Sequence, residues 1–265
     1  MPYRCSDSIR YYFFESLQDA GVIHAIFTRQ GGSSPKPWAE LNLGGTVGDA
    51  PERVVENRLR AFRAIGQSAD SIFDVWQIHS SQVVIAQAPR PASQAPIKAD
   101  AIITDRPGVN LFMRFADCVP ILLFEPIKKS VGIVHAGWEG TVKRIAEATI
   151  RMMRAEYGAK EGNIFAAIGP SIGAHHYEIG TEVVEKVRHV FGSDADGLLS
   201  RYNGKPKGSG LQFDLWEANR LILEQAGLRN IEISGICTAC HLEDWYSHRG
   251  EAGVTGRFGA VIGFG

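Results

Sequence analysis

The sequence has little excess charge, no long apolar run and no stretch of basic residues, and each absence excludes a class of protein. Over 265 residues the formal net charge is −1 at pH 7. Such a chain lacks the positive surface that binding to nucleic acid or to an anionic membrane requires. No apolar stretch approaches the roughly 18 residues of a membrane span. We therefore expect neither a nucleic-acid partner nor a membrane partner.

Signals for export and histidine-rich motifs are also missing. The first residues show no succession of basic, apolar and small-residue regions, so we expect a cytoplasmic protein. Its four cysteines are then free thiols or metal ligands, not disulfides. Only eight histidines occur, and none forms a His-x-His pair. Copper clusters that need many histidines, commonly in His-x-His pairs, are therefore disfavoured.

What is present is an ordinary globular composition, with 45% hydrophobic and 22% charged residues. Short apolar segments alternate with segments of helical periodicity, and no composition shift marks a boundary. This pattern predicts one α/β domain over residues 1–265. The expected strands are 11–15, 22–28, 72–78, 82–87, 99–104, 111–115, 119–124, 131–135, 163–168, 230–236 and 258–264. The expected helices run from an N-cap at Asp49 to about Ile65, from about Glu139 to Gly158, and over 181–191 and 214–226, the last two separated by a loop at 203–210.

Three residues that can bind metal lie at the ends of predicted strands. His79 follows the strand 72–78, Cys118 lies between two strands, and His135 ends the strand 131–135. Two imidazoles and a thiolate suit zinc or copper, and a site with three protein ligands leaves one coordination position open. The sequence therefore predicts a catalytic metal site at these three residues.

The same atoms allow a second interpretation, a Cys–His nucleophilic pair. The neighbouring Asp117 is a candidate for a general acid or base, and alternatively for a group that orients a metal ligand. Gly137 permits a close approach to His135. Both interpretations of the three residues remain open at this stage.

Glycine-rich loops provide candidates for an anion site. The loop 28–52 contains five glycines together with Arg29 and Asn42, and Arg249 and Arg257 also lie beside glycines. Backbone N–H groups and a guanidinium can bind a phosphate. We therefore predict Arg29, Asn42 and Arg249 as phosphate or substrate ligands; the alternative is a mobile surface loop and solvated arginines.

The segment from Cys237 to His241, CTACH, has the letters of a haem attachment string, but haem attachment requires export. As half of a zinc ribbon it would need a second Cys/His pair nearby, and none follows in the sequence. A redox pair or two unbonded thiols is the remaining interpretation. The adjacent His175 and His176 are left out as metal ligands, because adjacent residues rarely bind one ion together.

Eight segments in order resemble one family, the bacterial purine nucleoside phosphorylases with the mammalian laccase-domain protein. The family has long been described as multicopper polyphenol oxidases, and bacterial members are also called peptidoglycan editing factors. The segments are TRQGG (28–32), LNLG (41–44), QIHS (77–80), ADCVP (116–120), VHAGW (134–138), GPSIG (169–173), FDLWEANR (213–220) and SHRGEAGVTGR (247–257).

The resemblance implies a fold, a metal trio and a set of activities. The implied fold is α/β, with mixed sheets sandwiched between helices in α/β/β/α layers. The implied metal ligands are His79, Cys118 and His135. The implied activities are phosphorolysis of adenosine, inosine, guanosine and methylthioadenosine, and deamination of adenosine, at a zinc or copper site. The implied partners are small molecules, a purine nucleoside and phosphate; nothing in the sequence indicates the oligomeric state.

The predicted metal site explains deamination more fully than phosphorolysis. A zinc ion with three protein ligands lowers the pKa of its water to about 7, and the hydroxide can attack C6 of adenine. Phosphorolysis needs an anion site near C1′ as well, which the glycine and arginine loops are candidates to supply. Two alternatives are a copper-dependent polyphenol oxidase and a non-catalytic module that binds a nucleotide or a cell-wall precursor.

Overall fold

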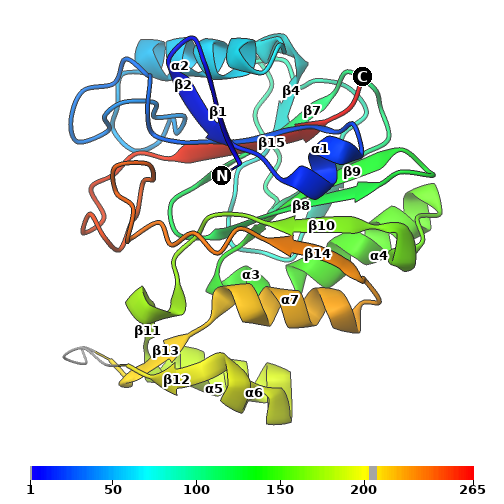
Figure 1. The fold of residues 1–265 in the computed structure, drawn as a ribbon, viewed down its shortest axis with the longest axis vertical. Helices are drawn as coiled ribbons and strands as arrows, with labels where there is room; N and C mark the ends of the chain where they lie inside the picture. Colours follow the sequence, from blue (N-terminus) through cyan, green and yellow to red (C-terminus); the bar gives the residue numbers. More distant parts are fainter. Residues whose placement is uncertain (1, 203–207) are drawn as a thin grey trace.

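Two mixed six-stranded sheets form the centre of the protein (Figure 1). The computed structural model describes residues 2–202 and 208–265. In the first sheet the strand order is β1 (Tyr3–Ser6), β2 (Ile9–Tyr12), β3 (Ile23–Phe27), β15 (Phe258–Gly263), β7 (Asn110–Phe115) and β4 (Ile72–Asp74). In the second it is β14 (Asn230–Ile233), β10 (Phe165–Ile168), β8 (Val119–Glu125), β9 (Ser130–Ala136), β6 (Ala101–Thr104) and β5 (Val83–Ile85). The pairs β4–β7, β10–β14 and β5–β6 are parallel, and the other neighbours are antiparallel.

The two sheets face each other, and the alternation of side chains along β8 shows how. Leu122 and Phe124 pack into a core that also contains residues of β7 and β15 from the first sheet. Val119, Ile121 and Leu123 belong to a different core, which they share with helices. Because successive side chains of a strand point to opposite faces, β8 is buried on both sides.

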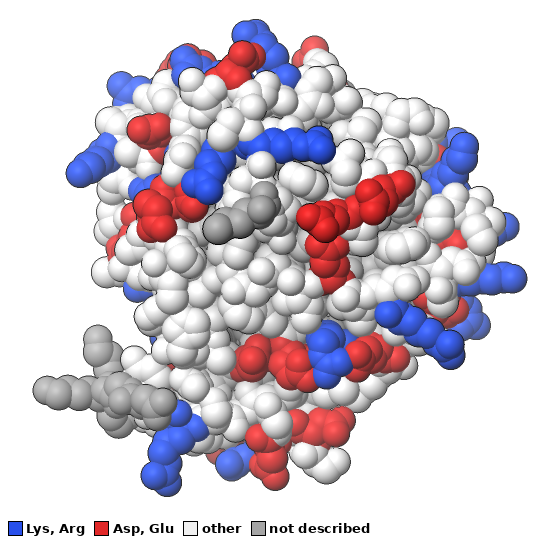
Figure 2. All heavy atoms as spheres, in the orientation of Figure 1, with Lys and Arg blue, Asp and Glu red and all other residues white. Residues whose placement is uncertain are grey.

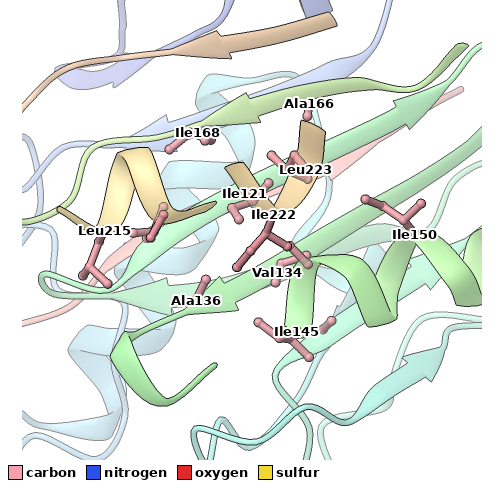
Figure 3. Packing of buried hydrophobic residues seen from close by; sticks show 14 of the residues in the cluster. Ile121, Val134, Ala136, Ile145, Ile150, Ala166, Ile168, Leu215, Ile222 and Leu223 are labelled. Atoms are coloured by element: carbon pink, nitrogen blue, oxygen red, sulfur yellow. The ribbon is translucent and has the colours of Figure 1, made fainter. Parts of the chain in front are cut away.

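Helices cover the outer faces of both sheets. The helix α2 (Pro51–Ala64) packs Ala61 and Phe62 against Phe27 of the first sheet. On the other side, α4 (Ile145–Tyr157) and α7 (Leu215–Gln225) cover the second sheet, and Figure 3 shows Ile145, Ile150 and Ile222 packed over its strands. The predicted α/β fold with mixed sheets between helices is therefore confirmed.

The remaining helices are α1 (Glu15–Asp19), α3 (Trp138–Val142), α5 (Thr181–Phe191) and α6 (Ala195–Leu198), with single 3-10 turns η1 (Ala69–Ser71), η2 (Glu161–Asn163), η3 (Ala174–His176) and η4 (Gly192–Asp194).

A small third sheet lies below the second one in Figure 1, beside α5 and α6. Its strand order is β11 (Glu178–Ile179), β13 (Leu211–Phe213) and β12 (Leu199–Arg201), and both pairs are antiparallel. None of these strands was predicted. Each spans two or three residues, which is too short for a periodic pattern to show. The predicted loop at 203–210 has residues 203–207 outside the described part of the chain.

The structure confirms the strands 111–115, 119–124 and 131–135 and corrects three other boundaries. Asp49 does not cap α2, whose N-cap is Ala50. The predicted helix from Glu139 to Gly158 is two helices, broken where Arg144 adopts a left-handed backbone with φ of 54°. The strand predicted over 72–78 ends at Asp74, which leaves the segment that follows free to bend toward the second sheet.

Charges are dispersed over the surface. On the face drawn in Figure 2, acidic and basic side chains are interspersed around a largely uncharged centre. Within the ranges that the structure describes, no helix is both long and apolar enough to cross a membrane.

Candidate metal centre

His79, Cys118 and His135 meet at one end of the two sheets. One ligand atom from each lies within 4.8 Å of the others. Cys118 immediately precedes β8 and His135 lies near the end of β9; Val119 pairs with Ala136, so the register of these two strands places Cys118 beside His135. His79 comes from the loop after β4, and its ring centroid is 5.0 Å from that of His135. The structure thus brings together the three residues that were predicted as metal ligands from their positions at strand ends.

Asp100 holds two of the three residues in place, and the sequence analysis missed it. Its fully buried carboxylate lies 2.9 Å from Nδ1 of His135 and accepts hydrogen bonds from the backbone N–H of His79 at 3.0 Å and of Ser80 at 2.6 Å. The loop that carries His79 is therefore wrapped around the carboxylate that orients His135. The only signal in the sequence was an acidic residue at the start of an apolar strand.

This contact determines which nitrogen of His135 is free. An ionised carboxylate only accepts hydrogen bonds, so Nδ1 of His135 carries the proton and Nε2 keeps its lone pair. Burial would raise the pKa of Asp100, but hydrogen bonds from His135 and Ser80 outweigh it and lower that pKa to about 2. Burial, reinforced by the nearby His79, lowers the pKa of His135. Both groups are thus held in the protonation states that a metal ligand and its supporting carboxylate require.

Cys118 is not prepared to act as a free nucleophile. Burial and the adjacent carboxylate of Asp117 raise the pKa of its thiol to about 12. Its Sγ lies 3.9 Å from Nε2 of His79, which is too far for strong activation of a thiol. Since a reactive cysteine needs a lowered pKa, these observations favour the metal-ligand interpretation over the Cys–His nucleophilic pair.

The donor set and the space around it fit a metal ion. Two neutral imidazoles and one cysteine are a common ligand set for zinc and copper. Gly137 leaves the room, because a Cβ atom there would lie 2.8 Å from Sγ of Cys118 and 3.2 Å from Cδ2 of His79. His79 is also held in a left-handed backbone conformation, with φ of 58°, which non-glycine residues adopt rarely and often at functional sites.

Three hydrogen bonds hold the carboxylate of Asp117 in place. Its Oδ1 accepts hydrogen bonds from the hydroxyls of Thr238 and Ser247, each at 2.7 Å, and its Oδ2 accepts one from the backbone N–H of Arg249 at 2.6 Å. These bonds tie the residue before Cys118 to two segments near the C-terminus. The geometry favours the alternative in which Asp117 positions Cys118 over the one in which it transfers protons.

Asn42 and Arg29 occupy structural positions, contrary to their prediction as phosphate ligands. Asn42 is fully buried, and its amide bonds to Gly44 and Asp49. The guanidinium of Arg29 bonds to two backbone carbonyls and to Glu251, and it lies over the ring of Tyr246. For both residues the structure argues against a phosphate contact, because Asn42 is fully buried and the side chain of Arg29 is only 14% exposed.

Two other arginines lie near the trio. Arg249 is exposed, and its guanidinium lies 5.3 Å from the ring centroid of Tyr177. Arg257 is half-buried. Its positive charge lies close enough to Cys118 to favour the thiolate, which opposes the larger effect of burial on the pKa of that thiol. The glycine-rich motif around Arg257 was noticed in the sequence, but only the fold places this residue beside Cys118.

A second group of four residues also has the geometry of a metal site. One ligand atom from each of its members lies within 4.8 Å of the others; they are His175, His176, Cys237 and Cys240. The expectation that the Cys-x-x-Cys pair lacks a second pair of ligands nearby is therefore wrong. The missing pair lies far away in the sequence, and the tertiary structure brings it to the cysteines.

Comparisons with known proteins relate the chain to one family. Residues 23–265 match the model of a family described as "Multi-copper polyphenol oxidoreductase laccase". The purine nucleoside phosphorylase of Deinococcus radiodurans is 41% identical over 242 residues, covering 91% of this chain and 89% of that protein. The purine nucleoside phosphorylase YlmD of Bacillus subtilis is 37% identical over 250 residues, covering 91% of this chain and 88% of that protein.

A solved structure shares the whole fold. The hypothetical protein YfiH of Bacillus licheniformis superposes with a TM-score of 0.89 at 31% identity, over 100% of this chain and 99% of that one.

Proposed function

We propose that this chain, which belongs to the multi-copper polyphenol oxidoreductase laccase family, is a metal-dependent purine nucleoside phosphorylase. The observation that carries the proposal is the group formed by His79, Cys118 and His135, held in place by Asp100. Two relatives that bear the name purine nucleoside phosphorylase share 41% and 37% of aligned residues with this chain. The proposed substrates are adenosine, inosine, guanosine and methylthioadenosine, each with inorganic phosphate.

His79, Cys118 and His135 would hold a zinc ion, with copper as the alternative. When bound, such an ion supplies Lewis acidity, which stabilises negative charge that develops on a substrate. Asp100 keeps the proton of His135 on Nδ1, so that Nε2 would be free to bind the ion. Ser80 and the backbone of His79 hold that carboxylate in turn.

The arginines beside the trio supply the proposed anion site. In phosphorolysis the bond between C1′ and the purine nitrogen breaks, an oxygen of phosphate bonds to C1′, and the purine leaves with the electron pair and takes up a proton. The guanidinium of Arg257 lies close to Cys118 and Asp117. The backbone N–H of Arg249 bonds to Asp117, and its exposed guanidinium lies over the ring of Tyr177. Guanidinium groups bind phosphate through two parallel hydrogen bonds, and we assign these residues to the incoming phosphate.

Deamination of adenosine is the second activity that we propose for the same site. Zinc-dependent nucleobase deaminases also use a ligand set of histidine and cysteine and add water to the ring carbon that carries the amino group. The set formed by His79, Cys118 and His135 is of this type. The two activities differ in the co-substrate, phosphate or water.

Oxidation of phenols is less well supported. Among the described residues, each group with metal-ligand geometry contains two histidines, fewer than a trinuclear copper cluster with a separate mononuclear centre would need. A non-catalytic binding module is the other alternative, and it would bind a nucleoside without converting it.

The test is adenosine turnover by the zinc-loaded protein with and without phosphate, beside the variants Cys118→Ala and Cys5→Ser. Cys5 is exposed and lies outside both groups, which makes its variant a matched control. We expect adenine and ribose-1-phosphate only with phosphate, unchanged in Cys5→Ser and lost in Cys118→Ala. Inosine formed without phosphate would report the deaminase. Oxygen-dependent oxidation of a phenol without nucleoside turnover, or binding without turnover, would refute the proposal.

A further inference from the structure

The group formed by His175, His176, Cys237 and Cys240 plays no part in the proposed reaction. Nε2 of His175 lies 3.1 Å from Sγ of Cys240, and Nδ1 of His176 lies 3.5 Å from Sγ of Cys237 and 3.6 Å from Sγ of Cys240. Both ring nitrogens thus point at sulfur atoms. These short contacts form one compact set of four donors.

Local backbone structure explains how two adjacent histidines reach the same point. They lie in the 3-10 turn η3, in which successive residues are rotated by about 120°. His175 presents its far nitrogen, Nε2, and His176 its near nitrogen, Nδ1. Because the two side chains leave the turn in different directions but use different ring nitrogens, both nitrogens reach the same cysteines. The expectation that adjacent residues rarely bind one ion together therefore does not apply to His175 and His176.

The two cysteines are arranged as a metal-binding turn. The N–H of Cys240 donates to the carbonyl of Cys237 at 3.2 Å, which closes the Cys-x-x-Cys segment into a tight turn. The N–H of Gly173 donates to Sγ of Cys237 at 3.2 Å. A backbone donor aimed at sulfur stabilises a thiolate, the form in which cysteine binds metal.

We propose that His175, His176, Cys237 and Cys240 bind a second divalent metal ion, zinc, in a closed structural site. A Cys₂His₂ set fills all four positions of tetrahedral zinc and leaves no place for a substrate, whereas the trio at Cys118 leaves one open. Binding releases one proton from each thiol, so the two thiolates neutralise the ion. The site links the segment after β10 to the segment after β14.

The segments that carry these four residues are also connected to the candidate active site. Thr238, between the two cysteines, donates its hydroxyl to Asp117, the neighbour of Cys118. On the other side, the guanidinium of Arg249 donates to the carbonyl of Glu178 at 3.1 Å. An ion held by the four ligands therefore restrains the segments that position Asp117 and Arg249. The competing use of the cysteines is a disulfide between Cys237 and Cys240, which would leave both histidines without a role.

The first test is the zinc content of the full-length protein, purified and dialysed against a weak chelator, by elemental mass spectrometry. We expect two equivalents per chain in the wild type, one in Cys240→Ser, one in Cys118→Ala and none in the double variant. Cys5→Ser and His241→Ala serve as controls, because each removes a donor type outside both groups, and both should keep two equivalents. One equivalent in the wild type and in Cys240→Ser alike would overturn the proposal.

A second measurement covers the case in which a variant fails to fold. Cobalt(II) is added to the metal-free Cys118→Ala protein, whose four proposed ligands are intact. We expect the absorption of tetrahedral cobalt with thiolate charge-transfer bands, abolished by adding His175→Ala. An octahedral spectrum without these bands would contradict the proposal. So would a mass two hydrogens lower, with Cys237 and Cys240 resistant to alkylation, in the protein as purified.

Discussion

The carboxylate of Asp100 lies 2.9 Å from Nδ1 of His135 and also accepts the backbone N–H of His79. One buried side chain thus orients one proposed metal ligand and anchors the loop that delivers another. The third proposed ligand, Cys118, is positioned in a comparable way by Asp117, which is tied to Thr238 and Ser247. Two carboxylates outside the proposed ligand set therefore hold these three residues in place.

Asp100→Asn should weaken metal binding. The amide is uncharged and cannot accept all the hydrogen bonds that both carboxylate oxygens accept, so His135 and the loop of His79 lose their restraint. We expect zinc affinity at the trio to fall by about 10- to 100-fold, the usual effect of removing such a partner. Competition with a chromophoric chelator measures it, with Glu156→Gln, a change of an exposed glutamate of α4 outside the ligand group, as the control. An unchanged affinity would show that Asp100 does not support the ligands.

Gly137→Ala should impair the same centre by crowding. The new methyl would lie 2.8 Å from Sγ of Cys118, and overpacking of this kind costs about 1–3 kcal/mol. We expect a loss of both metal affinity and nucleoside turnover. Gly162→Ala, where a Cβ atom meets no heavy atom within 4 Å, should leave both intact. Equal behaviour of the two variants would mean that the space beside Cys118 is not needed.

Asp117→Asn separates a positioning role from proton transfer. Asparagine tolerates the left-handed backbone at this position, φ of 81°, but one acceptor oxygen becomes a donor. A hydrogen bond to a charged group contributes about 1.5–3 kcal/mol, so we expect a lower melting temperature and weaker metal binding. Ser247→Ala should show the same changes in milder form if Asp117 acts by position. Loss of a limb of the pH profile of kcat in Asp117→Asn, with Ser247→Ala normal, would instead indicate a proton shuttle.

Arg249→Gln should affect phosphate selectively. If this exposed guanidinium binds the incoming phosphate, its loss removes one charged hydrogen bond, which corresponds to about a tenfold change. We expect a tenfold higher KM for phosphate with the KM for adenosine unchanged. Arg188→Gln, on the exposed side of α5, is the control. A parallel rise in both KM values would assign Arg249 to the nucleoside or to the loop structure.

Stability should fall in mildly acidic solution because of His24, which lies far from the metal ligands in the sequence. This buried ring accepts the N–H of Phe14 at Nε2 and pairs with the carbonyl of Val22 at Nδ1. Burial lowers its pKa below the ordinary value of 6.5. The unfolded chain therefore takes up the proton first, and stability falls as the pH drops from about 6.5 through the folded-state pKa.

Thermal melts between pH 7.5 and pH 5 measure this dependence. His24→Gln, which has no titrating ring, should flatten the curve, and His189→Gln, at an exposed position, should leave it as in the wild type. An identical slope in all three proteins would assign the acid sensitivity to other groups.

Several features were accessible from the sequence because they depend on neighbouring residues. The apolar strands that end near Cys118 and His135 are visible as local patterns. The helices predicted over 181–191 and 214–226 likewise correspond to α5 and α7. The family resemblance rested on short ordered segments, three of which contain the proposed ligands His79, Cys118 and His135.

Only the tertiary structure decided which distant side chains meet. Asp100 looks like any acidic residue before a strand until the loop of His79 folds over it, and Asn42 looks like a loop residue until its burial is seen. His175 and Cys240 are separated by 65 residues, and no local pattern relates them. Secondary structure follows from interactions within a few residues, whereas a metal site and its supporting carboxylates depend on how sheets and loops pack together.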